Sequence, residues 1–137
     1  MKFVLDASVA LAWAFEDERS GTSLAVLDEL ERSEAITSAI WSLEVVNGLL
    51  TAERRGRISA PAANRFGALL LELPIVIDPQ ERRRAFDAVR QLARSHRLTA
   101  YDASYLEVAL RHGLPLATLD GRLARAAADA GVALLGA

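Results

Sequence analysis

Four acidic residues stand at positions where carboxylates are expected to do chemistry. Asp6 and Asp120 each follow a short apolar run and precede a predicted helix, Asp102 lies in the first turn of another, and Glu44 interrupts an apolar helix face. Carboxylates that converge on one crevice take up protons or recruit cations. An all-oxygen ligand set without His or Cys suits Mg²⁺ or Mn²⁺, which assist the attack of water on phosphodiesters.

Helix capping offers another explanation for three of these acids. Asp6 and Asp120 stand where an N-cap residue would stand, and Thr99 with Asp102 has the spacing of a capping box. Glu44 has a different alternative, since an unpaired buried carboxylate is costly. It would then pair with an arginine or lie at a helix edge that faces solvent.

The helix face of Asp102 favours a role inside the protein. Tyr105, Leu106 and Ala109 follow it at i+3, i+4 and i+7, so Asp102 is expected to point toward the body of the molecule. Acids at the carboxyl ends of parallel strands meet in one crevice only if those strands are neighbours. The sequence does not establish that adjacency.

The elements that must position these acids alternate along the chain. Short apolar runs predict strands at 2–5, 35–38, 75–77, 116–119 and 132–135, with the run at 75–77 expected to be buried. Helices are predicted at 7–15, 21–32, 40–54, 60–73, 81–96, 99–112 and 121–130. This alternation predicts an α/β fold, and the length of 137 residues predicts a single domain over 1–137. Function in such sheets usually lies beyond the carboxyl ends of the strands.

Composition excludes several classes of protein. The chain has no cysteine, which excludes disulfides, thiolate metal sites and Cys nucleophiles. The formal net charge of −2 excludes a strongly basic nucleic-acid coat, although without the four acids it would be 16 − 14 = +2. No apolar run has the length of a membrane span, and no signal peptide precedes the first strand, so a cytoplasmic protein without membrane contact is expected.

The predicted helix at 60–73 is apolar almost all round. Phe66, Leu69, Leu70, Leu71 and Leu73 give it no consistently polar face, so it must be covered on more than one side. A homodimer or a larger single core would provide that cover. The two tryptophans, Trp13 and Trp41, are either core residues or anchors for a partner.

Four ordered motifs make the chain resemble the PIN-domain ribonucleases, and specifically the VapC-type toxins of bacterial toxin–antitoxin pairs. The motifs are Val4-Leu5-Asp6-Ala7-Ser8, Leu43-Glu44-Val45, Leu98-Thr99-Ala100-Tyr101-Asp102-Ala103-Ser104-Tyr105 and Leu116-Ala117-Thr118-Leu119-Asp120. The third motif is the most specific, and the resemblance runs along nearly the whole chain. It implies a three-layer α/β/α fold with a central parallel sheet of four to five strands.

The resemblance also implies a function and a set of site residues. The implied activity is Mg²⁺- or Mn²⁺-dependent cleavage of RNA, in which Asp6, Glu44, Asp102 and Asp120 hold metal and position the attacking water. Ser8 and Thr118 would be hydroxyl neighbours of the site, with a first-turn serine and a β-branched strand residue as the alternative interpretation. A cognate antitoxin that blocks the cleft and a toxin homodimer are the implied partners.

Arg122 is the candidate for contact with the substrate phosphate, because it lies two residues beyond Asp120; a solvated helix face is its alternative. A haloacid-dehalogenase-type phosphatase would need Asp at the position of Ser8. A receiver domain would need a lysine near its acidic pocket, and Lys2 is the only lysine of the chain. A non-catalytic interaction module remains an alternative, as does a DNA-directed PIN nuclease, which the small size of the chain disfavours.

Overall fold

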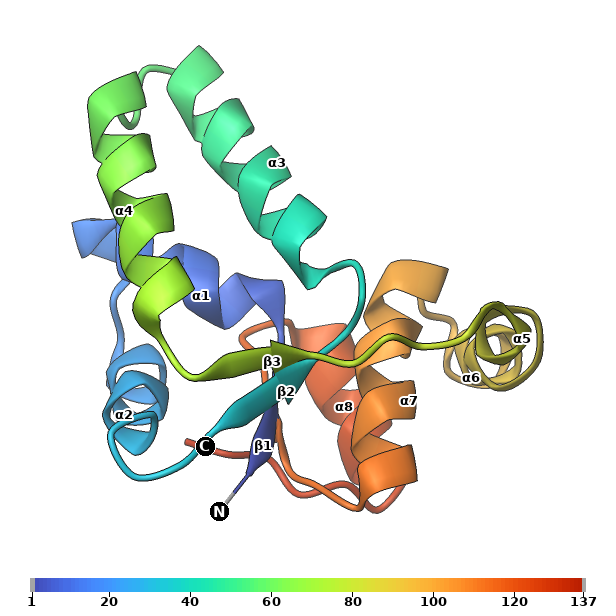
Figure 1. Cartoon of the computed structure of the whole chain (residues 1–137). Coiled ribbons are helices and arrows are strands. Elements are labelled where there is room, and N and C mark those ends of the chain that lie inside the picture. The colour runs from blue at the N-terminus through green and yellow to red at the C-terminus, as the bar shows by residue number, and fades with distance from the viewer. Residues whose placement is uncertain (1, 137) are drawn as a thin grey trace.

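A four-stranded parallel sheet forms the centre of the part of the chain that the computed structural model describes, residues 2–136 (Figure 1). Its strands are β1 (Phe3–Leu5), β2 (Ala35–Thr37), β3 (Ile75–Ile77) and β4 (Leu116–Ala117), in the order β3-β2-β1-β4. Every pairing is parallel, with Val4 opposite Ile36 on one side and opposite Leu116 on the other. The α/β prediction is confirmed, with four strands rather than five.

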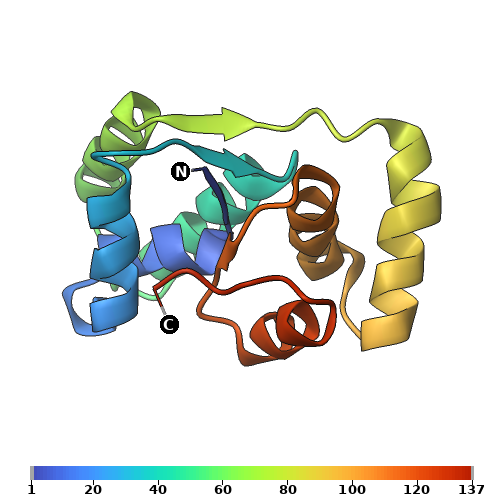
Figure 2. The same ribbon diagram turned by 90° about the horizontal axis from the view of Figure 1, so that it is seen from below.

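Helices cover both faces of the sheet (Figure 2). One layer contains α1 (Ala7–Ala14), α2 (Gly21–Glu29), α3 (Trp41–Arg54) and α4 (Ala60–Glu72), with the 3₁₀ turn η1 (Glu16–Glu18) between the first two. The other layer begins with one continuous helical segment, made of α5 (Arg82–Arg84), the π turn η2 (Ala85–Val89) and α6 (Arg90–His96). The same layer also contains α7 (Ala100–His112) and α8 (Gly121–Asp129). Across residues 2–136, no helix combines the length and the apolar character needed to cross a bilayer.

The core is densest around β1 and α7. All three residues of β1 are fully buried, as are Tyr105 and Leu106 on α7. Central parallel strands are covered on both faces, which explains their uninterrupted apolar sequence. The strand that precedes Asp6 and the helix that carries Asp102 therefore both lie in the buried core.

The close approach of α1 and α3 depends on Gly48. A Cβ atom at Gly48 would lie 2.5 Å from a methyl carbon of Leu11, so a larger residue would displace the Leu11 side chain from its place against α3. Gly48 follows Glu44 by one turn of α3. The glycine thus sets where the helix that carries Glu44 lies relative to β1 and α1.

A polar network attaches the end of β3 to α7. The Arg111 guanidinium donates to Asp78 at 2.8 and 3.0 Å and to Glu107 at 2.8 and 3.0 Å, and both carboxylates are buried. The Gln80 amide donates to the carbonyl of Ser104 at 2.9 Å and accepts from the N–H of Ala39 at 3.0 Å. This network links the β2–α3 connection, the end of β3 and α7.

Two predicted strands differ from the structure. The 75–77 strand is not buried: β3 is an edge strand with one neighbour, and Val76 and Ile77 are 44% and 40% exposed. The segment at 132–135 forms only a single bridge, between Leu134 and Leu116. Gly131 and Gly136, both with positive φ, bend the chain on either side of this segment.

Candidate active site

The acidic residues gather at the point where the sheet changes direction. The chain winds from β1 outward to β2 and β3 and then returns to place β4 on the other side of β1. A crevice forms at such a switch point, beyond the carboxyl ends of the two strands. Asp6 directly follows β1, its N–H donates to the Ala117 carbonyl of β4 at 3.0 Å, and Asp120 lies three residues beyond Ala117. The adjacency that the sequence left open is therefore present.

Asp6 is held by two hydroxyl groups. Ser8 Oγ and Thr118 Oγ1 both donate to Asp6 Oδ2, at 2.7 and 2.6 Å. The same hydroxyl oxygens accept backbone N–H groups, from Leu119 at 3.0 Å and from Asp120 at 3.0 Å. Ser8 and Thr118 thus connect the ends of β1 and β4. Asp6 is the N-cap residue of α1 by position, as the sequence suggested, but its side chain makes no capping bond, so capping does not account for the carboxylate.

Asp120 does cap its helix. One carboxylate oxygen, Oδ1, accepts from the N–H groups of Arg122 at 2.9 Å and Leu123 at 3.0 Å. The cap fixes the side chain at the mouth of the crevice. Capping and a place in the acidic site are compatible here, because the cap occupies only one of the two oxygens.

Glu44 has a partner that the sequence did not identify. The Tyr105 hydroxyl donates to Glu44 Oε1 at 2.5 Å, so the carboxylate is paired with a phenol rather than with an arginine. Tyr105 is fully buried, and a buried tyrosine hydroxyl needs a partner. Its place three residues after Asp102, on the same buried face, was the available signal, but nothing in the sequence links it to Glu44.

Asp102 lies in the first turn of α7, half-buried. Its N–H donates to the Thr99 hydroxyl at 3.1 Å, so the predicted cap at Thr99 is confirmed. The helix face that continues through Tyr105 and Leu106 is buried, as expected. Asp102 therefore lies at the junction between the core and the crevice.

Burial and mutual repulsion act on three of the four acids. Burial raises the pKa of Asp6, against the two hydroxyl bonds, and the charge of Asp120 raises it further. Burial raises the pKa of Glu44, and the charges of Asp6 and Asp102 add to that rise. Burial, then Asp120 and Asp6, raise the pKa of Asp102. The four carboxylates therefore share one electrostatic field, which a bound cation would relieve.

These carboxylates suit a hard cation as donors but do not form a complete cage. Among residues 2–136, no three His, Asp or Glu side chains lie close enough together to hold a metal ion as they stand. Mg²⁺ usually keeps several of its waters and binds through one or two carboxylates. The residues thus fit an ion whose remaining ligands are water and substrate.

A comparison with known protein families identifies the family of this chain. The model of the PIN domain matches residues 3–129. The chain belongs to the PIN domain family. The ribonuclease VapC3 of Pyrobaculum aerophilum is 30% identical over 124 residues, which cover 90% of this chain and 93% of that relative.

Solved PIN-like structures share the fold of this chain. PAE2754 from Pyrobaculum aerophilum has a TM-score of 0.68 at 28% identity, covering 92% of this chain and 84% of that one. FitAcB from Neisseria gonorrhoeae has a TM-score of 0.66 at 22% identity, covering 98% and 96%. VapC20 from Mycobacterium tuberculosis, a sarcin–ricin loop cleaving toxin, has a TM-score of 0.65 at 17% identity, covering 90% and 94%. The PIN-like fold is confirmed.

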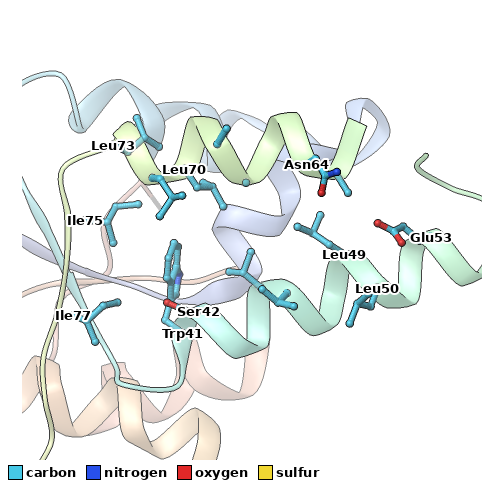
Figure 3. Close-up of a pocket in the computed structure, with 16 residues that line it drawn as sticks. Trp41, Ser42, Leu49, Leu50, Glu53, Asn64, Leu70, Leu73, Ile75 and Ile77 are labelled. Atoms are coloured by element: carbon cyan, nitrogen blue, oxygen red, sulfur yellow. The ribbon is translucent and has the colours of Figure 1, made fainter. Parts of the chain in front are cut away.

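A second surface, the apolar groove, lies between α3, α4 and β3 (Figure 3). It encloses about 610 Å³, and its lining includes Trp41, Leu49, Leu70, Leu71 and Ile77. Trp41 is buried, yet its indole N–H has no hydrogen-bond partner within residues 2–136. The groove is thus lined mostly by apolar side chains, and the indole N–H of Trp41 is buried beneath it and, within the described residues, unpaired.

Helix α4 is not absorbed into a larger core. Leu69 and Leu71 are 62% and 89% exposed, while Ala63 and Leu70 are its buried residues. Of the two explanations for this helix, the larger single core is therefore wrong. Trp13 is a core residue, and its indole N–H donates to the Ser23 carbonyl at 2.7 Å.

Proposed function

We propose that the protein is a divalent-metal-dependent endoribonuclease that hydrolyses RNA phosphodiester bonds as the toxin of a type II toxin–antitoxin system. The observation that carries the proposal is the shared field of Asp6, Glu44, Asp102 and Asp120 at the β1–β4 crevice. The similarity to a relative named as a ribonuclease supports the reaction class.

Each acid has a distinct role in this proposal. Mg²⁺ or Mn²⁺, when bound by the four carboxylates, would supply Lewis-acid activation of water and of the phosphate. Asp6, fixed by its two hydroxyl neighbours, and Asp120, fixed by its cap, would hold the ion. Asp102 and Glu44 would complete the ion site and orient the attacking water. Glu44 Oε2 makes no hydrogen bond within residues 2–136 and is suited to accept a proton from that water.

Arg122 would contact the phosphate of the substrate. It is exposed at the start of α8, and its N–H is fixed by Asp120. A guanidinium binds phosphate in a two-pronged geometry that lysine does not offer. The position beside a proposed metal-holding carboxylate supports this role.

A cleavage assay with purified full-length protein tests the proposed reaction. We expect labelled RNA to be cleaved with Mg²⁺ or Mn²⁺, and cleavage to stop when the ions are chelated. Asp6→Asn and Asp102→Asn should each lower the rate by roughly 100-fold or more, since each removes a charge from the ion site. Asp28→Asn, on the exposed surface of α2, is the matched control and should retain the wild-type rate.

Other outcomes identify the alternatives. Cleavage that persists in the presence of chelator would contradict the metal mechanism. Binding of a partner protein without cleavage of any RNA would favour the non-catalytic interaction module. Cleavage of DNA but not of RNA would favour the DNA-directed nuclease. Growth arrest on expression should vanish with Asp102→Asn, and arrest by that variant would show that toxicity does not come from catalysis.

Two surfaces support the expected protein partners. The apolar groove suits an apolar segment of the antitoxin. Leu69 does not line the groove and, being exposed, supports a homodimer through the outer side of α4. We expect Leu71→Glu to abolish antitoxin binding and Leu69→Glu to yield a monomer in light scattering. If Leu71→Glu instead yields a monomer and Leu69→Glu abolishes antitoxin binding, the groove is the dimer surface and the outer side of α4 binds the antitoxin.

A further inference from the structure

A basic cleft lies between the end of α6 and the exposed face of α8. It encloses about 450 Å³, and its charged or ionisable lining residues are His96, Arg97, Arg122, Arg125 and Asp129. Both helices belong to the layer opposite α1 to α4 (Figure 2). The cleft is therefore separate from the apolar groove.

The arginines of this cleft are not neutralised by the protein. Within residues 2–136, Arg97, Arg122 and Arg125 form no ion pair with a carboxylate, whereas Arg57 and Arg111 elsewhere each bind two. Three unpaired guanidinium groups around one cavity repel each other. An anionic ligand would relieve that repulsion.

Helix electrostatics do not explain the arginines on α8. The N-terminus of a helix carries partial positive charge and disfavours cations. Arg122 lies in the first turn, and Arg125 Nη1 lies 3.9 Å from the position that a Cβ atom would take at Gly121. Both cations thus stand near the end of α8 where they stabilise the helix least.

Arg97 occupies a strained backbone position. It ends α6 with φ of 54°, and only one other non-glycine residue within 2–136, Gln80, has a positive φ. Glycine adopts this left-handed conformation without steric cost and is the usual residue at such a helix end. A side chain kept at the expense of strain indicates a function for that side chain.

On both of its sides, the cleft contains a residue that is close in the chain to one of the four acids. Arg97 precedes Thr99, the N-cap of the helix that carries Asp102, by two residues. Arg122 follows Asp120 by the same number. A nucleic-acid strand whose phosphate occupied the crevice would therefore have its neighbouring phosphates within reach of the cleft.

We propose that the basic cleft is a phosphate-binding subsite that holds the RNA backbone next to the cleaved bond. The inference rests on the proposed ribonuclease function and adds to it the residues that bind the strand, Arg97 and Arg125 together with Arg122. The lining contains no Phe, Tyr or Trp on which a base could stack. The cleft thus binds the charged phosphates of the backbone and does not distinguish between base sequences.

Anisotropy titration with a labelled single-stranded RNA tests the cleft apart from catalysis. The titration uses the Asp6→Asn full-length protein in Mg²⁺, so that bound RNA stays intact, at several salt concentrations. We expect Arg125→Gln and Arg97→Gly each to weaken binding on the order of fivefold. Each should also reduce the slope of log affinity against log salt by about 0.7, the value for one lost phosphate contact on a single strand.

Arg97→Gly separates a binding role from a structural one. It removes the guanidinium and also relieves the positive φ, so its thermal midpoint should equal or exceed that of the parent while its RNA affinity falls. Arg65→Gln, an exposed arginine on α4, is the charge-matched control and should bind RNA like the parent.

Three results would overturn the inference. Unchanged affinity and salt slope in both cleft variants would exclude the subsite, while the proposed function would stand if the wild type still cleaved RNA. A cleft variant that binds RNA normally but loses inhibition by the antitoxin would assign the cleft to an acidic protein segment. A loss of thermal stability in Arg97→Gly that accounts for its loss of binding would assign Arg97 a structural role. Failure of the wild type to cleave any RNA would instead refute the proposed function.

Discussion

At the scale of single residues, three of the four acids of the site are each fixed by a different kind of partner. Asp6 accepts two hydroxyl groups, Asp120 accepts two backbone N–H groups, and Glu44 accepts a buried phenol. Such outer partners orient carboxylates that hold metal. Tyr105 is the most informative of them, because it joins the acid of α3 to the helix that carries Asp102.

Replacing Tyr105 with Phe should weaken the affinity for metal without unfolding the protein. The phenyl ring still fills the same buried volume, but Glu44 loses the hydrogen bond that orients it. We expect the dissociation constant for Mn²⁺, measured by calorimetry, to rise about tenfold. Tyr101→Phe on the exposed face of the same helix is the control and should bind Mn²⁺ like the wild type. Equal affinity in the two variants would mean that the Tyr105 hydroxyl serves only the fold.

At the scale of elements, the acids depend on how α7 is attached to the edge of the sheet. Strand β3 has one neighbour, and its end is joined to α7 through Asp78, Arg111 and Glu107. The guanidinium of Arg111 holds the pKa of Asp78 far below its usual range. Hydrogen bonds from the same guanidinium lower the pKa of Glu107, against the effect of its burial.

Replacing Arg111 with Met should destabilise the fold strongly at neutral pH. It removes the guanidinium shared by two buried carboxylates. Within residues 2–136, the basic partners that remain are His112 for Asp78, at 2.8 Å, and Arg84 for Glu107, at 4.0 Å. Breaking a buried ion pair typically costs about 3–5 kcal/mol. Because the pKa of Asp78 is lowered in the folded state, the stabilisation is present above the ordinary Asp pKa and is lost as the pH falls below it. Urea unfolding should therefore show a large difference from the wild type at pH 7 and a smaller one at pH 3, below the ordinary Asp pKa of 3.8.

The control for this element is Arg65→Met, an exposed arginine outside the network, which should change the free energy of unfolding by less than about 0.5 kcal/mol. A difference between Arg111→Met and wild type that does not depend on pH would show that packing, rather than charge, accounts for the loss.

At the scale of the whole molecule, the net charge of −2 conceals two regions of opposite sign. The acidic residues lie at the ends of β1 and β4 and at the starts of α3 and α7, whereas the basic cleft lies between the end of α6 and α8, and an RNA strand would need both. Until a cation binds, the crevice repels phosphate. Metal binding is therefore expected to precede substrate binding and to stabilise the fold.

Divalent cations should raise the thermal midpoint, and more at pH 8 than at pH 5. The raised pKa values of Asp6, Glu44 and Asp102 mean that the folded state binds protons more tightly than the unfolded state does. Without metal, stability therefore falls as the pH rises through the folded pKa values. A cation at 100 times its dissociation constant would add about 2.7 kcal/mol. Thermal scans with Mn²⁺, and with NaCl at matched ionic strength as the control, measure the difference.

The metal-free Asp102→Asn variant provides the opposite test. It should unfold at a higher temperature than the wild type at pH 8, because one repelling charge is gone, and it should respond less to Mn²⁺. A rise in midpoint that is the same for Mn²⁺ and NaCl would reduce the effect to general screening.

Local signals in the sequence determined much of this molecule. The four strands that form, the helices that separate them and the caps at Thr99 and Asp120 follow from apolar periodicity and from side chains that bond their own backbone. The position of each acid just after a strand or in the first turn of a helix is equally local. These features depend on residues a few positions apart, which is why the sequence alone contains them.

Only the tertiary structure decided which of these elements meet. It placed β1 beside β4, paired Glu44 with Tyr105 rather than with an arginine, left β3 at an edge and left α4 uncovered. Each of these results depends on contacts between residues far apart in the chain, where many arrangements bury similar apolar area. The choice among them comes from close packing, such as the approach of Leu11 to Gly48, and from the pairing of buried polar groups.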